Sequence, residues 1–140
     1  RGCVRLSLFI DGKFVDSYVS DGLIISTPTG STAYALSSGG PVIVPDLEAF
    51  ETVPVCAHSL HARPIVYSTK SKAVVKIEEN GKACALYADG AFVKTLCAGE
   101  EIILEKSEMK AFVSIDDGKF FDKLNKKLNY WSITGGCKNE

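Results

Sequence analysis

The stretch VRLSLFIDGKFVDSYVS, residues 4–20, decides the fold class. Before its central Asp11-Gly12, apolar residues alternate with other side chains at Val4, Leu6, Leu8 and Ile10. Such alternation is typical of a strand with one buried face, and Asp-Gly is a preferred dipeptide of two-residue hairpin turns. The stretch therefore predicts an antiparallel hairpin at the start of the chain.

The same pattern continues along the chain. Four further Asp-Gly or Asn-Gly dipeptides stand at residues 21–22, 80–81, 89–90 and 117–118. We expect six more strands, at residues 64–68, 73–78, 84–88, 92–96, 101–105 and 109–115. Two helices are expected, at 31–38, before Gly39-Gly40-Pro41, and near the C terminus, where Phe121, Leu124, Leu128 and Trp131 recur at helical spacing. Many short strands indicate a sandwich or a barrel. We predict one mainly β, sandwich-like domain over residues 1–140.

Composition narrows the functional classes. The 140 residues are 46% hydrophobic and 24% charged, with a formal net charge of -1. A neutral chain does not favour nucleic acid or an anionic membrane as a partner, and no apolar run approaches the roughly 18 residues of a membrane span. The five cysteines form no C-x-x-C pair, which favours reduced thiols. We therefore expect a cytoplasmic protein.

Residues 21–45, DGLIISTPTGSTAYALSSGGPVIVP, concentrate the groups that could bind a ligand. A buried strand leads into a hydroxyl-rich turn and a short helix, where Gly30 permits close approach and Ser31 and Thr32 offer hydrogen bonds. The ring of Tyr34 could stack on a base. The segment lacks the Walker A lysine and the G-x-G-x-x-G fingerprint. Spacing alone therefore predicts a nucleotide or phosphorylated ligand, with an elaborate N-cap as the open alternative.

Four sequence blocks identify a family. The chain closely resembles the carboxyl-terminal domain of NAD kinases in these blocks, which are STPTGSTAY (26–34), Asp21-Gly22, Gly39-Gly40-Pro41 and HSLHARPIV (58–66). These enzymes use ATP or polyphosphate, with Mg²⁺ or another divalent cation, to phosphorylate the ribose 2'-hydroxyl of NAD. The resemblance implies that residues 26–38 line an NAD-binding cleft. It places substrate contacts at Asp21, Thr29, Thr32, Ala33, Tyr34, Ser37 and Cys56.

Some positions depart from the family or carry a simpler explanation. Many members read Asp-Gly-Gln where this chain has Asp89-Gly90-Ala91, so Ala91 loses any contact made by that side chain, and Asp89 is interpreted mainly as a hairpin residue. A turn residue is likewise the alternative for Asp21, and simple packing for Cys56. His58 and His61 do not make a metal site, because no third ligand stands in register.

The resemblance also predicts what this chain lacks. In this family Gly-Gly-Asp-Gly, whose aspartate is the proposed general base, lies in an amino-terminal α/β domain, and the Asn-Glu pair that recognises adenine and ribose precedes the position equivalent to Arg1. We expect both to be missing from this chain, in which no Gly-Gly-Asp-Gly occurs. Because the chain opens at Arg1 inside a strand-like run, we expect a fragment or excised domain. We predict no catalytic residue here and no turnover by this chain alone. The resemblance also implies that this chain is an NAD-binding and oligomerisation domain that forms a homodimer or homotetramer, in which a neighbouring subunit can supply contacts such as Asp21. The alternatives are a non-catalytic dinucleotide-binding or assembly module and a relative of the lipid kinases.

Overall fold

A computed structural model describes residues 2–109 and 119–133 of the chain. The expected strand at 109–115, after Met109, and the turn at 117–118 lie outside these residues. The chain divides into two compact units, Arg1–Ser107 and Glu108–Glu140, which are described separately. The single domain expected over residues 1–140 stays a prediction.

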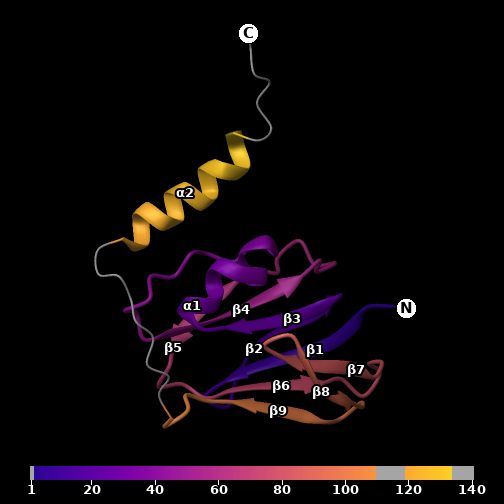
Figure 1. Ribbon diagram of the computed structural model, residues 1–140. Helices are drawn as coiled ribbons and strands as arrows, with labels where there is room; N and C mark the ends of the chain where they lie inside the picture. Colours follow the sequence, from indigo (N-terminus) through magenta and orange to yellow (C-terminus); the bar gives the residue numbers. More distant parts are fainter. Residues whose placement is uncertain (1, 110–118, 134–140) are drawn as a thin grey trace. The chain divides into compact units, whose positions relative to one another are not determined.

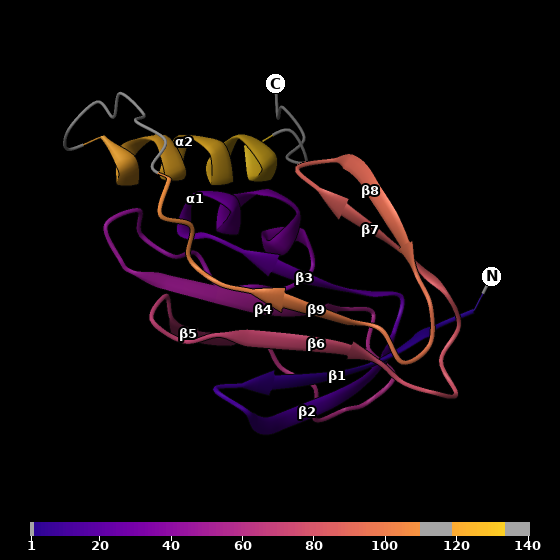
Figure 2. The ribbon, with the colours of Figure 1, turned by 90° about the horizontal axis from the view of Figure 1, so that it is seen from below.

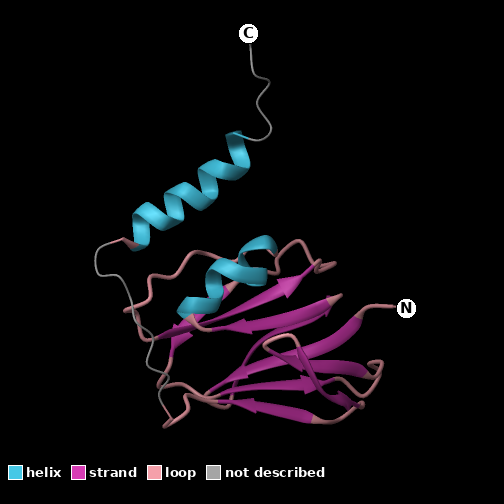
Figure 3. Ribbon diagram, in the orientation of Figure 1, coloured by secondary structure: helices cyan, strands magenta, loops and turns pink. Residues whose placement is uncertain are grey.

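The first unit contains nine strands in three antiparallel sheets (Figure 1). The largest has the order β2 (Lys13–Ser20), β1 (Val4–Ile10), β6 (Ala73–Ile77) and β9 (Glu101–Leu104). The second has the order β3 (Gly22–Ser26), β4 (Ala49–Val55) and β5 (Ile65–Ser68). The third is the hairpin of β7 (Cys84–Ala88) and β8 (Ala91–Leu96). Strands thus dominate this unit, as Figure 3 shows.

The apolar core joins these sheets. Leu8 of β1 and Ile77 of β6 are fully buried, as the alternation of apolar residues in both strands requires. Leu23 and Ile25 of β3 pack against this cluster from the three-stranded sheet, and Leu96 of β8 belongs to it. Because apolar faces of separate sheets share one core, the sandwich-like fold expected from the sequence is confirmed.

The Asp-Gly and Asn-Gly dipeptides have two different roles. Asp11 and Asp89 have φ values of 51° and 48°, and the glycine after each also has a positive φ. These two dipeptides therefore form the expected hairpin turns, β1–β2 and β7–β8. Asp21-Gly22 and Asn80-Gly81 instead connect strands of different sheets, so the expectation of tight hairpins was wrong there. A dipeptide specifies the local turn but not which strand pairs next.

A helical segment follows β3 and covers one face of the three-stranded sheet. It comprises α1 (Pro28–Gly30) and η1 (Ser31–Ala35), and the helix is kinked at Ala33, whose φ of −101° and ψ of −127° are not helical. In Figures 1 and 2 this segment overlies β3 and β4, which it also contacts. Leu23 and Ile25 pack into the core, so the alternate residues of β3 face the helical side.

Both ends of the helical segment have sequence signals. Pro28 occupies the first turn and the Thr27 hydroxyl caps the amide of Gly30, so the helix starts three residues before the expected Ser31. At the other end Gly39 has a φ of 88°, and the amide of Gly40 donates to the Ala35 carbonyl at 2.9 Å. This Schellman-type arrangement confirms the helix stop expected from Gly39-Gly40-Pro41.

The second unit contains the helix α2 (Phe120–Ile133). It confirms the C-terminal helix predicted from apolar residues at helical spacing. Among the described residues, no helix is both long enough and apolar enough to span a membrane.

Candidate functional site

The hydroxyl-rich segment of residues 26–38 divides into buried and exposed groups. Ser26 and Ser31 are buried, while Thr29, Tyr34 and Ser37 are exposed. Tyr34 is 63% exposed, so its ring is open to solvent. The segment therefore contains a structural set of hydroxyls and a second set that faces outward.

The buried hydroxyls hold the segment in place. The Ser31 hydroxyl donates to the Pro28 carbonyl at 2.7 Å and accepts from the Ile43 amide at 3.0 Å. The Ser26 hydroxyl donates to the Thr27 carbonyl at 2.9 Å. A Cβ at Gly30 would lie 2.6 Å from the Ser26 hydroxyl oxygen. Close packing against Ser26 therefore explains why a glycine stands at position 30. The sequence interpretation had assigned Gly30 to close approach of a ligand and did not predict this packing.

The predicted substrate residues of this segment lie on the helical turns. Thr29, Thr32, Ala33, Tyr34 and Ser37 follow one another along Pro28–Ser37, and Thr32 is half-buried with its hydroxyl 3.5 Å from the Thr29 carbonyl. The backbone is kinked at Ala33, in the middle of this set. The structure brings these five predicted residues together on one short segment.

Asp21 and Cys56 lie beside each other at the other end of β3. The amide of Asp21 donates to the Val55 carbonyl at 2.9 Å, and Gly22 pairs with Val55 across the strands. Both side chains are exposed. Cys56 has a φ of 48°, a left-handed conformation that is uncommon for a residue other than Gly, Asn or Asp. Backbone held in this way often marks a functional position, and packing alone does not account for an exposed thiol.

Asp89 and Ala91 belong to the β7–β8 hairpin, which is a separate sheet from the one that carries the helical segment. They flank Gly90 at the tip of the two-stranded hairpin, where Ala91 pairs with Ala88. The left-handed φ of Asp89 agrees with its interpretation as mainly a hairpin residue. Nothing in the geometry at this tip points to a substrate contact for Ala91.

A buried carboxyl group lies beneath the helical segment, and the sequence reasoning missed it. Glu51 of β4 is fully buried and pairs with Ser26 across the strands. Within the described residues neither of its carboxylate oxygens has a hydrogen-bond partner, and one lies 3.1 Å from where a Cβ on Gly40 would be. Burial raises the pKa of the Glu51 carboxyl above its usual value of 4.5. A charged residue inside the strand AFETVPV was the available signal.

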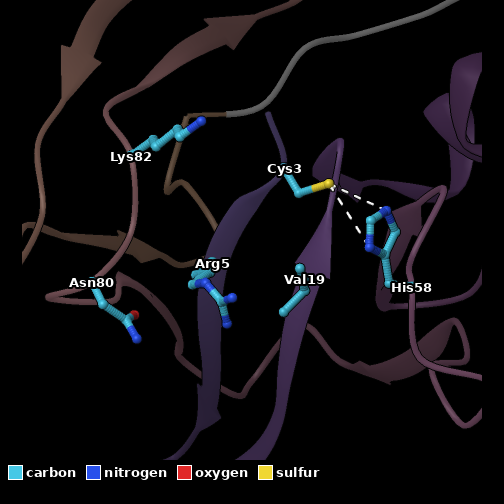
Figure 4. Close-up of a pocket in the computed structure, with 6 residues that line it drawn as sticks. All are labelled: Cys3, Arg5, Val19, His58, Asn80 and Lys82. Atoms are coloured by element: carbon cyan, nitrogen blue, oxygen red, sulfur yellow. Dashed lines mark hydrogen bonds between the residues drawn. The ribbon is translucent and has the colours of Figure 1, made fainter. Parts of the chain in front are cut away.

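Two cavities open on the first unit. One of about 400 Å³ is lined by residues that include Ser26, Thr27 and Phe50, so the start of the predicted segment lines a hollow. The lining does not include Thr29 to Ser37, and the cleft expected over residues 26–38 is therefore found only in part. The other, of about 300 Å³, is lined by Cys3, Arg5, Val19, His58, Asn80 and Lys82 (Figure 4).

The described residues supply no evident metal centre. In residues 2–109 and 119–133, no three His, Cys, Asp or Glu side chains gather closely enough to hold an ion. His58 lies 3.2 Å from the Cys3 sulfur, and the amide of His61 donates to the Ser59 hydroxyl at 3.2 Å. The Cys3–His58 contact joins residues 55 apart in sequence, so no local motif could have predicted it.

Curated sequences similar to this chain are named NAD kinase. That of Desulforamulus reducens is 41% identical over 129 residues, which cover 91% of this chain and 45% of the relative. That of Koribacter versatilis is 40% identical over 127 residues, with the same coverage. The chain thus spans about half the length of the curated relatives it matches.

Solved structures resemble the fold over nearly the whole chain. Yeast NADH kinase complexed with NADH has a TM-score of 0.81 and 27% identity, covering 92% of this chain and 41% of its own. An NAD kinase from Archaeoglobus fulgidus in complex with ATP has a TM-score of 0.76 and 36% identity, covering 91% and 49%. A family model described as the ATP-NAD kinase C-terminal domain matches residues 1–115. These sequence and structural matches agree, and the chain belongs to the family of ATP-NAD kinase C-terminal domains.

Proposed function

We propose that this chain is the dinucleotide-binding part of an enzyme that transfers a phosphoryl group to the 2'-hydroxyl of NAD, making NADP. The observation that carries the proposal is the outward-facing set Thr29, Tyr34 and Ser37, with the half-buried Thr32 between them, on a segment fixed by buried hydroxyls. Pre-organised polar groups beside an exposed ring suit a ligand with both hydroxyls and flat bases. The relative with bound NADH supports a dinucleotide, and the relative with bound ATP supports ATP as the phosphate donor.

Each group has a task in this proposal. The Tyr34 ring packs on a base or ribose, while the hydroxyls of Thr29 and Ser37 bind polar atoms of the dinucleotide. The interrupted helix at Ala33 lets its backbone approach the ligand. Asp21 and Cys56 form a second group of contacts. A neighbouring copy in a homodimer or homotetramer contributes this second group, which agrees with its position at the opposite end of β3 from Ser26.

The phosphate donor and its metal are assigned to other parts of the enzyme. Mg²⁺ in such sites is held by carboxylates and by the phosphates of its substrate. The described residues show no suitable cluster of carboxylates for this cation. ATP or polyphosphate and the cation are then bound by the whole enzyme, which acts in the cytoplasm. This chain orients NAD, the phosphate acceptor.

Calorimetric titration with NAD tests the proposal through two variants. Tyr34→Ala is expected to weaken NAD binding by about 1–3 kcal/mol, because the exposed ring loses its stacking contact. His61→Ala is the matched control, since it also removes an exposed ring from a loop of the same unit. Its affinity should equal that of the unchanged chain. Equal losses in two folded variants would remove Tyr34 from the site.

A further inference from the structure

We propose that Cys3 is a site of reversible mixed-disulfide formation with small disulfides that carry carboxylates, and that His58, Arg5 and Lys82 promote the reaction. The juxtaposition lies in the cavity of about 300 Å³ outside the NAD-binding segment. Figure 4 shows the side chains of Cys3 and His58 pointing toward each other. No part of the proposed phosphoryl transfer uses them.

His58 is held where it can take the proton of the thiol. Its Nε2 atom lies 3.2 Å from the Cys3 sulfur, and Nδ1 lies 4.0 Å away. The amide of His58 donates to the Val19 carbonyl at 2.8 Å, which fixes the loop after β4 against β2. A thiol beside an imidazole can transfer its proton and become the nucleophilic thiolate. The Cys3 sulfur is partly exposed and the cavity gives a disulfide access to it.

The charges around Cys3 select the reagent. Arg5 and Lys82 line the cavity, and its six lining residues include no carboxylate. The Lys82 ammonium lies against the backbone next to Cys3, because a Cβ on Gly2 would be 2.5 Å from its Nζ. Two cations beside the cavity attract an anionic reagent. Small disulfides with carboxylate groups, such as glutathione disulfide, combine both requirements.

The exchange balances without any further oxidant. His58 accepts the thiol proton, and the Cys3 sulfur attacks one sulfur of the small disulfide. The disulfide bond of the reagent breaks as the bond between Cys3 and one half forms. The other half leaves as a thiolate and receives the proton. Cys3 is oxidised, the reagent is reduced, and an excess of the small thiol reverses the reaction.

Cys84 is the matched control within the same chain. It is as partly buried as Cys3, but burial, and then the nearby Glu100, raises the pKa of its thiol. Cys97 is an exposed thiol that reports access alone. Exposure by itself therefore predicts that Cys97 reacts before Cys3, whereas the proposal predicts the reverse order.

Peptide mapping by mass spectrometry after timed incubation of the protein with glutathione disulfide tests the proposal. Cys3 should be modified about tenfold faster than Cys84 and faster than Cys97. His58→Gln should lower the rate at Cys3 several-fold and leave Cys97 unchanged, whereas His61→Gln should change neither. Lys82→Gln should slow the reaction with glutathione disulfide more than the reaction with neutral bis(2-hydroxyethyl) disulfide.

The rate at Cys97 and the far-ultraviolet circular dichroism spectrum show whether each variant is folded. If His58→Gln unfolds the chain, the Lys82→Gln comparison between charged and neutral reagents decides the matter. Modification of Cys3 no faster than Cys97, or equal effects of Lys82→Gln on both reagents, would overturn the proposal.

Discussion

Glu51 shows what one residue adds to the pH dependence of the fold. Its carboxyl is fully buried, without a hydrogen-bond partner among the described residues, and burial raises its pKa. The folded state therefore holds the proton at pH values where the unfolded state has lost it. Stability from this group is fully present below the unfolded value near 4.5 and falls as pH rises through the raised folded pKa.

Glu51→Gln should remove this dependence. At pH 7 the variant should unfold with a free energy higher than that of the unchanged chain by on the order of 1 kcal/mol, because no buried charge forms. The advantage should shrink as the pH falls below 4.5, because Glu51 then becomes mostly neutral in both states. Urea denaturation across this pH range measures the difference, with Asp46→Asn as an exposed control. A constant difference at every pH would show that burial of the charge is not its cause.

Residue-scale prediction from the sequence succeeded where the signal is local. Asp89 was expected in a hairpin turn and has the required left-handed φ. The left-handed φ of Cys56 had no local signal, because cysteine has no intrinsic preference for that conformation. The Cys3–His58 contact and the burial of Glu51 likewise depend on strand pairing between distant parts of the chain.

At the scale of elements, the fit between the helical segment and β4 depends on Gly40. A Cβ at this position would lie 2.8 Å from the Val53 side chain and 2.9 Å from the Ala35 carbonyl. The backbone cannot move away freely, because the Gly40 amide donates to that same carbonyl. The segment with the predicted substrate residues is therefore seated on the sheet at a glycine.

Gly40→Ala should destabilise the chain by about 1–3 kcal/mol, the usual cost of overpacking. Gly22→Ala is the control, because a Cβ there meets nothing within 4 Å and the backbone needs no positive φ. Its thermal unfolding midpoint should stay near that of the unchanged chain. If calorimetric melting gives both variants the same midpoint, close packing at Gly40 does not hold the helical segment in place.

The positions of strands and helices could be predicted from the sequence better than the pairing of one strand with another. Alternation located the hairpin of β1 and β2, and glycine placed the end of the helical segment. The pairing of β1 with β6 joins strands more than sixty residues apart, as the register Ile10 to Ala73 shows, and no turn residue encodes it. The core common to the three sheets selects that pairing, which is a property of the folded chain.

At the scale of the whole molecule, the proposed acceptor site and the groups for its chemistry belong to different parts of the enzyme. The chain spans about half the length of the relatives named NAD kinase. Its sequence contains no Gly-Gly-Asp-Gly, the motif expected to supply the general base. General-base assistance contributes about 10²–10⁴-fold to such a transfer, and stabilising the moving phosphoryl charge contributes more. Asp21 and Asp89 are the acidic residues of the predicted site, and both lie in turns next to glycine.

We therefore expect no measurable NADP from the 140-residue chain with ATP or polyphosphate and Mg²⁺. A coupled NADP assay beside the NAD kinase of Desulforamulus reducens, which is about twice as long, measures this under identical conditions. Calorimetric NAD binding to the same preparation shows that the acceptor site is formed. Sustained turnover by the chain would mean that its own residues supply the base. Asp21, exposed beside the strained Cys56, would then be the first carboxylate to replace, as Asp21→Asn.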